Sequence, residues 1–167
     1  LLAGRQCIIW KENVRQEHIF HRNNELAGYC AVMHAFSLIG QNPGGYGKDL
    51  RIAVIGYGAT GKGTVHALLG LGANDVTVFS KRSKFEIEDA ITFIKYRTYQ
   101  ITESKVLIDN KGAIEVLRQY DVIINCILQD TDNPIIFIKN NELNAFKKNT
   151  LIIDVSCDIG FSVHVIT

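Results

Sequence analysis

The sequence predicts an α/β fold built on a doubly wound parallel sheet, and three observations support this prediction. Short apolar runs typical of strands alternate with helical patterns along the chain. The run LRIAVIG at 50–56 is almost entirely apolar, as expected for a parallel strand buried on both faces. A glycine-rich turn follows this run directly and opens the next helical pattern. With 167 residues, the chain is long enough for one domain with a buried core.

A long helix is the main element expected before the glycine-rich turn. Asn23 and Asn24 are suitable N-caps for it, and Glu25 would lie in its first turn. Its apolar residues are dense and form no single stripe, which predicts burial on most sides. In chain order we expect a strand at 5–10, a polar connector at 11–22, the helix at 25–40, a boundary rich in turn residues at 41–49 and the strand at 50–56.

Helices and strands alternate after the glycine-rich turn. One helix is expected because Phe85, Ile87, Ile91 and Ile94 are spaced for a single helical face. The expected helices span 58–72, 84–96, 113–120 and 141–148, and the expected strands span 75–79, 105–108, 121–128 and 150–157. This alternation is typical of a parallel sheet with helices on both faces.

Composition and charge argue against several classes of function. The formal net charge of +1 gives no electrostatic case for binding nucleic acid or a membrane surface. No apolar run is long enough to span a bilayer and no signal-peptide pattern opens the chain, so we expect a cytoplasmic protein. The cysteines form no Cys-x-x-Cys pair, which argues against a metal site. They are Cys7, Cys30, Cys126 and Cys157.

The glycine-rich turn matches G-x-G-x-x-G, with Gly56, Gly58 and Gly61 at the glycine positions. Its place between a buried strand and a helix is the context of a dinucleotide-binding (Rossmann) fold. Gly56 would permit the tight turn, Gly58 would let a pyrophosphate approach, and Gly61 would let the helix pack closely on the strand. Ala59 and Thr60 open the helix, whose free amides would favour the diphosphate. The alternative is a glycine-rich turn in an unrelated domain.

The turn after the second predicted strand indicates which dinucleotide is bound. NAD-binding domains usually carry Asp or Glu there, bonded to the ribose 2′-hydroxyl. This chain has Ser80, Lys81, Arg82 and Ser83 instead. A guanidinium can hold a 2′-phosphate with two hydrogen bonds and a lysine adds a point charge, whereas a carboxylate would repel the phosphate. We therefore expect NADP(H), with NAD(H) and a solvated basic turn as the alternatives.

Residues after the later strands complete the expected site. In doubly wound sheets, ligands lie beyond the carboxyl ends of the strands. Cys126 and Ile127 arrive at this edge after one strand, and Asp158 follows the last strand. Asp158 is the candidate catalytic carboxylate, because a nicotinamide ring would lie there. The alternatives are a turn-forming role for Asp158 before Gly160 and a structural role for Asp154 inside the strand.

Four segments stand out in combination: NNELAG, LRIAVIGYGATGKG, DVIINCIL and TLIIDVSCDIG. Together they resemble the alanine dehydrogenase and transhydrogenase family, and the likeness covers nearly the whole chain. Its most specific part is D-V-x-x-D-x-G, matched by Asp154, Val155, Asp158 and Gly160. The resemblance implies that Asp158 lies beside the nicotinamide and takes part in catalysis. It also implies that Asn24 lies near the nucleotide.

The resemblance further implies a domain arrangement. Residues 1–22 would form the end of a substrate domain and the crossover from it, and residues 23–167 would form the dinucleotide-binding domain. The chain would then be a fragment of a two-domain dehydrogenase. Because members of the family oligomerise, a homo-oligomer is expected, with the helix at 25–40 as a candidate interface.

Within the family, the departure at Ser80 separates two reactions. Alanine dehydrogenases carry Asp there, whereas NADPH-dependent N(5)-(carboxyethyl)ornithine synthases look more similar to this chain. The resemblance therefore implies reductive condensation of a keto acid (pyruvate) with an amino acid (ornithine or lysine) by hydride transfer to an imine. The alternatives are an NAD-linked alanine dehydrogenase, a nucleotide-sensing module without turnover, and an S-adenosylmethionine enzyme that shares only the glycine-rich loop.

Overall fold

The computed structural model describes residues 20–44, 49–87, 89–102, 105–128 and 134–155. Three expectations therefore lie outside the described residues. They are the strand at 5–10, the connector up to residue 19 and the position of Asp158.

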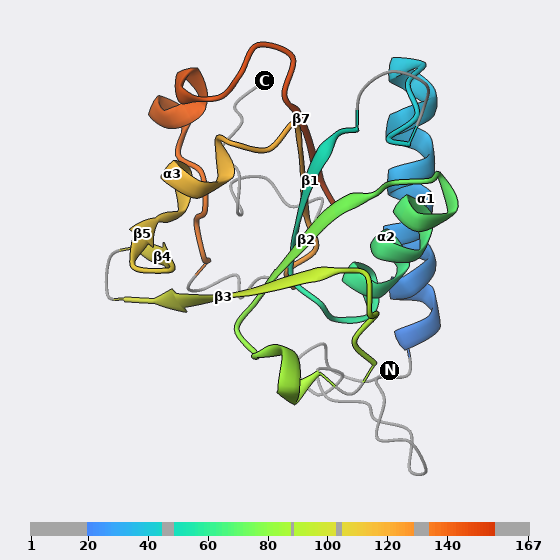
Figure 1. The fold of residues 1–167 in the computed structure, drawn as a ribbon, viewed down its shortest axis with the longest axis horizontal. Coiled ribbons are helices and arrows are strands. Elements are labelled where there is room, and N and C mark those ends of the chain that lie inside the picture. The colour runs from blue at the N-terminus through green and yellow to red at the C-terminus, as the bar shows by residue number, and fades with distance from the viewer. Residues whose placement is uncertain (1–19, 45–48, 88, 103–104, 129–133, 156–167) are drawn as a thin grey trace, which may run out of the picture.

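The described residues form one seven-stranded sheet in the spatial order β5-β4-β3-β2-β1-β6-β7 (Figure 1). The strands are β1 (Arg51–Ile55), β2 (Asp75–Ser80), β3 (Lys95–Ile101), β4 (Val106–Ile108), β5 (Lys111–Gly112), β6 (Val122–Asn125) and β7 (Leu151–Asp154). The five neighbouring strands β3, β2, β1, β6 and β7 are parallel to one another. At the other side of β3, β4 and β5 pair antiparallel and form one edge of the sheet. The order reverses between β1 and β6, where doubly wound sheets bind their ligands. The predicted fold class is confirmed.

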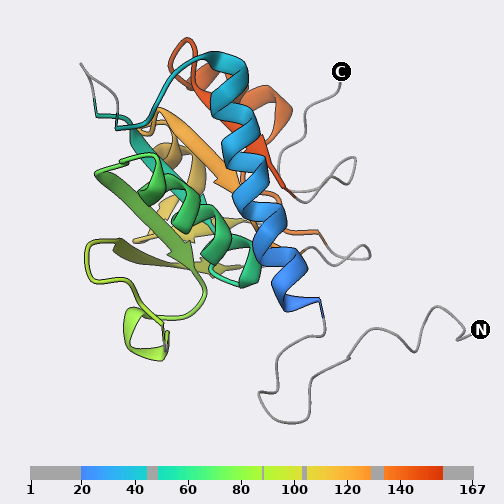
Figure 2. The ribbon, with the colours of Figure 1, turned by 90° about the vertical axis from the view of Figure 1, so that its right-hand side faces the viewer.

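Helices cover both faces of the sheet (Figures 1 and 2). One face carries α1 (His21–Ile39) and α2 (Ala59–Gly70), and the other carries α3 (Ala113–Leu117) and the 3-10 turn η2 (Asn140–Ala145). Successive residues of β1 divide between the two cores. Ile52 and Val54 pack toward α1 and α2, while Ala53 and Ile55 pack toward α3. Because β1 is buried on both faces, its sequence is almost continuously apolar.

Two glycines bring the backbones of α1 and α2 into direct contact. A Cβ on Gly28 of α1 would lie 2.0 Å from the carbonyl oxygen of Thr60, and a Cβ on Gly63 of α2 would lie 1.8 Å from that of Glu25. Neither position can carry a side chain without moving a helix. This close approach holds the second turn of α1 against the start of α2, next to the carboxyl end of the sheet where the candidate site lies.

The helix expected at 84–96 is wrong. Only η1 (Lys84–Glu86) forms a 3-10 turn, and the chain enters β3 at Lys95. Ile87 and Ile94 are buried whereas Phe85 is fully exposed, so the apolar spacing anchors an irregular segment to the core. Pairing of β3 with β2 accounts for the end of the segment only, because this pairing begins at Lys95. The other predicted elements after the turn overlap observed ones, although β6 ends at Asn125 and 141–148 gives the 3-10 turn η2 and no α-helix. Strands β3 and β5 were not predicted.

The start of the long helix also differs from the expectation. α1 begins at His21, and its N-cap residue, Phe20, makes no side-chain capping bond. Asn23 and Asn24 therefore occupy the first turn and do not cap it, and Glu25 follows that turn. The misplacement arose because the polar residues before Asn23 are typical of a connector. It hid the fact that this first turn faces the candidate site.

Helix α1 is more exposed than its apolar sequence suggests. Its buried residues are Gly28, Val32 and Phe36, which share one face, while Leu26 and Leu38 are exposed. The expectation of burial on most sides is wrong because α1 contacts the rest of the described chain along one face only. No helix in the described ranges is long and apolar enough to cross a membrane.

Candidate functional site

A cavity of about 910 Å³ lies at the carboxyl ends of β1, β2 and β6, beside the first turn of α1. It collects most of the residues that the sequence singles out. Those in its lining are Asn24, Gly56, Gly58, Ala59, Thr60, Ser80, Lys81, Arg82, Cys126 and Ile127. Gly61 and Ser83 are close in sequence but do not line it. Four segments that are distant in the chain thus meet at the edge where the strand order reverses.

The glycine-rich turn has the geometry that its sequence predicts. Gly56 has a φ of 96°, which favours glycine, and its amide donates to the carbonyl oxygen of Phe79 at 2.8 Å. A Cβ on Gly61 would lie 2.2 Å from the carbonyl oxygen of Gly56, so α2 packs directly on the turn. A Cβ on Gly58 would meet nothing within 4 Å. Gly58 therefore presents bare backbone to open space.

Helix α2 begins at this turn without a side-chain cap. Gly58 is its N-cap and offers no acceptor to the first amides. The first-turn N–H groups of a helix have no intrahelical acceptor, and together with the helix dipole they favour an anion. This twelve-residue helix therefore directs unsatisfied donors toward the cavity at Ala59 and Thr60.

The turn after β2 brings two cations to the cavity. Ser80 is buried, and its Oγ accepts a hydrogen bond from the amide of Arg82 at 3.1 Å. Arg82 donates from Nη2 to the carbonyl oxygen of Tyr57 at 2.8 Å, and Lys81 is exposed. No described lining residue is Asp or Glu. The site therefore has an excess of positive charge and hydrogen-bond donors.

Ser83 has a local structural role. Its amide donates to Oε2 of Glu86 at 2.6 Å, and the pair forms a capping box around η1. These bonds from Ser83 lower the pKa of Glu86 from its ordinary value. Ser83 thus fixes the turn that follows Arg82, and it lies outside the lining of the cavity.

The loop after β6 is held by a fully buried asparagine that the sequence analysis did not single out. Asn125 donates from Nδ2 to Oδ1 of Asp154 at 2.9 Å and accepts at Oδ1 from the amide of Ile127 at 3.3 Å. These two contacts support the structural role of Asp154. They also orient Ile127 at the cavity. The available signal was a polar residue at the end of an apolar strand.

Cys126 contributes a neutral wall to the cavity. Its Sγ lies 3.2 Å from Oγ1 of Thr64, and burial raises the pKa of the thiol to about 12. The thiol therefore stays protonated at neutral pH and is a poor nucleophile. Within the described ranges, no three His, Cys, Asp or Glu side chains are grouped so that they could hold a metal ion.

Several lining residues were missed from the sequence. They are Phe20, His21, Asn23, Ala27, Tyr57, Tyr99, Leu128 and Val155. His21, Asn24 and Ala27 recur at helical spacing, which would have revealed one face of a helix had α1 been predicted to begin earlier. Tyr57 and Val155 stand inside the G-x-G-x-x-G and D-V-x-x-D-x-G motifs but were not predicted to line the site, whereas Phe20, Tyr99 and Leu128 come from separate elements.

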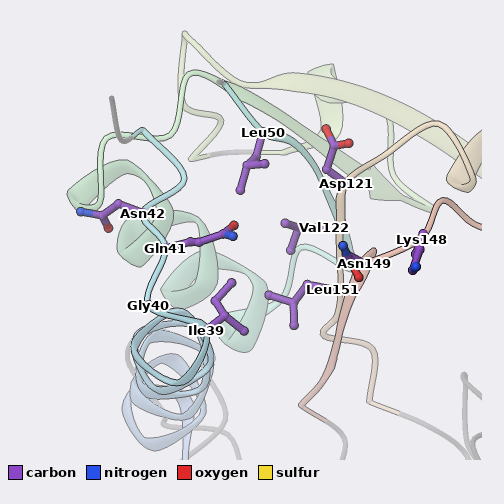
Figure 3. Close-up of a pocket in the computed structure, with 10 residues that line it drawn as sticks. All are labelled: Ile39, Gly40, Gln41, Asn42, Leu50, Asp121, Val122, Lys148, Asn149 and Leu151. Carbon is purple, nitrogen blue, oxygen red and sulfur yellow. The ribbon is translucent and has the colours of Figure 1, made fainter. Parts of the chain in front are cut away.

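A second cavity of about 620 Å³ lies at the opposite, amino edge of the sheet (Figure 3). Leu50, Val122 and Leu151 form its apolar wall, and Gln41 and Asn149 contribute amide groups. None of its described lining residues belongs to the G-x-G-x-x-G turn or to the N-terminus of a helix. Because doubly wound sheets bind ligands at the carboxyl edge, the larger cavity is the candidate site.

Strand order, glycine-rich turn and cavity position together define a domain of the Rossmann type. The model of the alanine dehydrogenase/PNT C-terminal domain matches residues 30–167, and the chain belongs to that family. The resemblance seen in the sequence is thereby confirmed.

Individual proteins are similar to the chain over part of their length. N(5)-(carboxyethyl)ornithine synthase from Lactococcus lactis subsp. lactis is 26% identical over 167 residues, which cover 97% of this chain and 43% of that protein. A transhydrogenase from Sinorhizobium meliloti has a TM-score of 0.59 and 19% identity over 80% of this chain and 40% of its own. An L-alanine dehydrogenase has a TM-score of 0.59 and 18% identity over 82% of this chain and 38% of its own. The structural likeness shows the fold, and the chain spans less than half the length of each protein.

Proposed function

We propose that this chain binds NADP(H) as the dinucleotide domain of an oxidoreductase that acts on carbon–nitrogen bonds. The observation that carries the proposal is the turn after β2, where buried Ser80 is followed by Lys81 and Arg82 at the cavity. An Asp or Glu at this turn would bond a ribose 2′-hydroxyl and repel a 2′-phosphate. An ammonium and a guanidinium attract that phosphate instead.

The other lining residues fit a dinucleotide. Gly58 leaves open space for a pyrophosphate to approach the backbone, and the uncapped start of α2 offers amide donors to it. Cys126 and Ile127 would give the far end of the cavity an uncharged surface. When bound, the nicotinamide supplies a hydride from its C4 position. The chain would orient the dinucleotide and supply the electrostatic environment.

For the reaction, we propose reductive condensation of pyruvate with ornithine or lysine. The carbonyl and the amino group would lose water to form an imine, and a hydride and a proton would reduce the imine to a secondary amine. The support is the 26% identity to N(5)-(carboxyethyl)ornithine synthase together with the absence of a carboxylate at Ser80. Residues 1–22 would belong to the substrate domain and its crossover, and 23–167 to the dinucleotide domain.

Asp158 is our proposed catalytic carboxylate. It follows β7 by four residues in the sequence, and β7 ends at Asp154, next to Val155 in the lining of the cavity. Asp158→Asn in the complete protein should abolish most turnover and leave the Kd for NADPH within about twofold, because the change removes a charge and keeps the shape. Equal losses of turnover and of NADPH binding would contradict a role in the chemical step.

The first test is a pair of fluorescence titrations of this chain with NADPH and NADH. We expect NADPH to bind at least about tenfold more tightly, the value of one additional charge-assisted contact. Equal or tighter binding of NADH would overturn the NADP(H) proposal and favour an NAD-linked alanine dehydrogenase. Turnover of the complete protein with pyruvate and ornithine should then give a secondary amino acid by chromatography, whereas an alanine dehydrogenase would give alanine.

A homo-oligomer also remains part of the proposal. The supporting observation is the outer face of α1, where the apolar side chains of Leu26 and Met33 are exposed. Light scattering of the complete protein should give a mass above that of one chain. A monomeric mass at working concentration would contradict the proposal.

A further inference from the structure

Tyr57 stands between the first two glycines of the turn, yet its side chain is almost fully buried. Its hydroxyl donates to the carbonyl oxygen of Asp89 at 3.2 Å. Its ring meets the ring of Tyr96 edge-on, with centroids 5.4 Å apart. Tyr96 in turn accepts a hydrogen bond at its hydroxyl from the amide of Ile91 at 2.9 Å. The side chain of Tyr57 therefore ties the glycine-rich turn to the segment that connects β2 to β3.

The backbone of the same residue holds the cation of the basic turn. The carbonyl oxygen of Tyr57 accepts from Nη2 of Arg82 at 2.8 Å. A guanidinium has five N–H donors in a fixed plane, so one bond to a neutral carbonyl sets its orientation and leaves further donors for a ligand. Both groups of Tyr57 thus act on one segment: the carbonyl on Arg82 at its start and the hydroxyl on Asp89 further along.

That segment needs such support because it is irregular. Between η1 and β3 the described residues form no helix or strand, and Phe85 and Phe93 project into solvent. A third tie comes from Lys62 in the first turn of α2, whose Nζ lies 2.6 Å from Oδ2 of Asp89. The segment that carries Arg82 is therefore aligned on the glycine-rich turn and on the start of α2.

We propose that Tyr57 is a positioning residue for cofactor selection, which holds Arg82 where a ribose 2′-phosphate must lie. This inference rests on the proposed preference for NADP(H). Selectivity for the phosphate is greatest when the donors are fixed before the ligand binds. Ordering a mobile guanidinium on binding costs free energy and so weakens the binding of NADPH. NADH has no 2′-phosphate, so its binding depends on the glycine-rich turn and α2 and not on this alignment.

The test compares Tyr57→Phe with the wild-type chain in titrations with NADPH, NADH, 2′,5′-ADP and 5′-ADP. Tyr57→Phe keeps the ring on Tyr96 and removes only the hydroxyl, which bonds the carbonyl oxygen of Asp89. We expect the ratio of the Kd for NADH to the Kd for NADPH to fall about two- to tenfold, the range for one intramolecular hydrogen bond. The Kd for NADH should stay within about twofold, and the 2′,5′-ADP to 5′-ADP preference should fall in parallel.

A matched control is Tyr120→Phe. Tyr120 is equally buried and its ring also meets an aromatic neighbour, Phe79, edge-on, but it does not line the candidate site. The control should change thermal stability only and leave both preferences at the wild-type value. Tyr57→Leu, which also removes the ring contact with Tyr96, should lower the ratio further than Tyr57→Phe.

Asp89→Asn separates alignment from direct attraction by Lys62. This change weakens the ion pair and leaves the lysine charge in place. If the segment is aligned by this contact, the preference for NADPH falls. If Lys62 instead contacts the ligand directly, Asp89→Asn frees Lys62 and strengthens the binding of both NADPH and NADH. That result would contradict the claim that the Lys62–Asp89 pair aligns the segment.

The outcomes distinguish the two proposals. A wild-type chain without preference for 2′,5′-ADP over 5′-ADP overturns the proposed function and the inference with it. A wild-type preference that survives Tyr57→Phe and Tyr57→Leu unchanged overturns the inference and leaves the proposed function standing. If the Tyr57 variants lose affinity for NADPH and NADH equally, Tyr57 supports only the fold, and this result also overturns the inference.

Discussion

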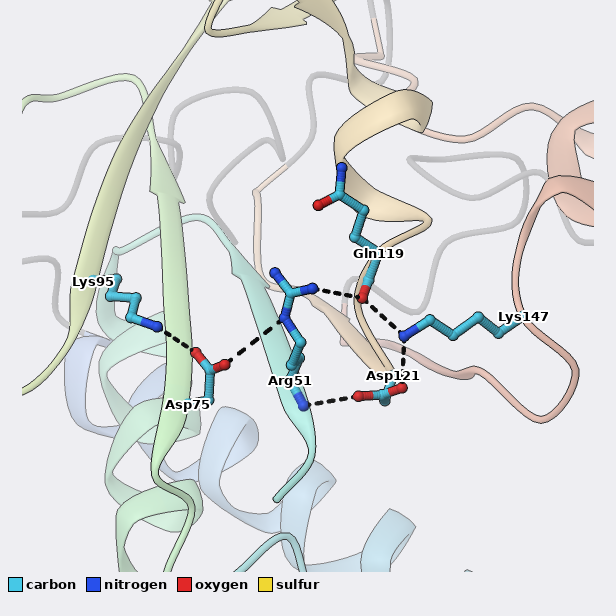
Figure 4. Close-up of polar contacts among 6 residues, drawn as sticks. All are labelled: Arg51, Asp75, Lys95, Gln119, Asp121 and Lys147. Carbon is cyan, nitrogen blue, oxygen red and sulfur yellow. Dashed lines mark hydrogen bonds and ion pairs between the residues drawn. The ribbon is translucent and has the colours of Figure 1, made fainter. Parts of the chain in front are cut away.

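The two edges of the central sheet use charged residues in opposite ways. At the amino edge, Asp121 accepts the amide of Arg51 at 3.0 Å and Nζ of Lys147 at 2.8 Å (Figure 4). Nearby, Lys95 lies 2.8 Å from Asp75. At the carboxyl edge, no described residue forms an ion pair with Lys81, and Arg82 is held by a neutral carbonyl. Lys81 and Arg82 therefore keep capacity for an anion, whereas Lys62 at the start of α2 is paired with Asp89.

The same contrast applies to the backbone. At the carboxyl edge, α2 begins without a side-chain cap and Gly58 faces open space. At the amino edge, the amide of Arg51 is bonded to a carboxylate, and Gln119 offers its carbonyl oxygen to Lys147 at 2.9 Å. The carboxyl edge has hydrogen-bond donors available for a ligand. At the amino edge the donors are used to join segments that are distant in the chain. The following predictions test this division.

The largest effect is expected at Gly61. Gly61→Ala places a Cβ 2.2 Å from a backbone oxygen of the glycine-rich turn, which cannot move without opening the start of α2. We expect a loss of about 2–4 kcal/mol in the free energy of unfolding, and loss of dinucleotide binding. Gly70→Ala at the other end of α2 is the matched control, because a Cβ there meets nothing within 4 Å. Chemical denaturation of both variants would measure the free energy of unfolding. An equal loss in Gly61→Ala and Gly70→Ala would contradict the close packing of α2 on the glycine-rich turn.

Cys126 tests whether the carboxyl edge presents reactive chemistry. Burial raises its pKa to about 12 from an ordinary 9.0, so its thiolate fraction at pH 8 is about a thousandfold lower than that of an exposed thiol. In an alkylation experiment read out by peptide mapping, exposed Cys30 should be labelled at least about a hundredfold faster than Cys126. Since the folded state keeps this proton, its contribution to stability is present below pH 9 and is lost as the pH rises toward 12. Equal labelling rates in the native protein would contradict a buried thiol.

Asp121 tests the structural role of the amino edge. Its side chain is mostly buried and accepts from both the amide of Arg51 and Lys147, so Asp121→Ala removes the acceptor of that amide and leaves Lys147 only the carbonyl oxygen of Gln119. We expect a loss of about 1–3 kcal/mol in the free energy of unfolding, with nucleotide binding unchanged. Lys95→Met, which removes an ion pair of a mostly exposed lysine, should cost less than about 0.5 kcal/mol. A change in the Kd for NADPH in Asp121→Ala, measured at a temperature where the variant is folded, would contradict the separation of the edges.

Much of the carboxyl edge could be predicted because its signals are local. The glycine spacing after an apolar strand and the residues from Ser80 to Arg82 each lie within a few positions. The amino edge could not be predicted, because Arg51 and Asp121 are seventy residues apart and nothing in either segment identifies the other. The burial of Tyr57 was hidden for the same reason, since it depends on a segment from another part of the chain.

The misplaced helix at 84–96 shows a second limit. Apolar residues spaced like Ile87, Ile91 and Ile94 match one face of a helix, and they equally match an irregular segment anchored at intervals to a core. In this chain Ile87 and Ile94 are buried in the core without a helix among the described residues between them, and the pairing of β3 with β2 sets the structure only from Lys95 onward. Local patterns cannot report such a partner. The error matters for function, because this segment follows Arg82.

Titration of Arg82→Asp with NADPH and with NADH shows whether Arg82 binds the 2′-phosphate, since only NADPH carries that phosphate. The account predicts that NADPH binding weakens about tenfold to a hundredfold, because a donor to the 2′-phosphate becomes a repelling carboxylate, while NADH binding changes less than about threefold. Arg118→Asp, an equal charge change at an exposed residue that does not line the cavity, should leave both affinities unchanged. Equal weakening of NADPH and NADH in Arg82→Asp would contradict the claim that this edge of the sheet selects the phosphorylated dinucleotide.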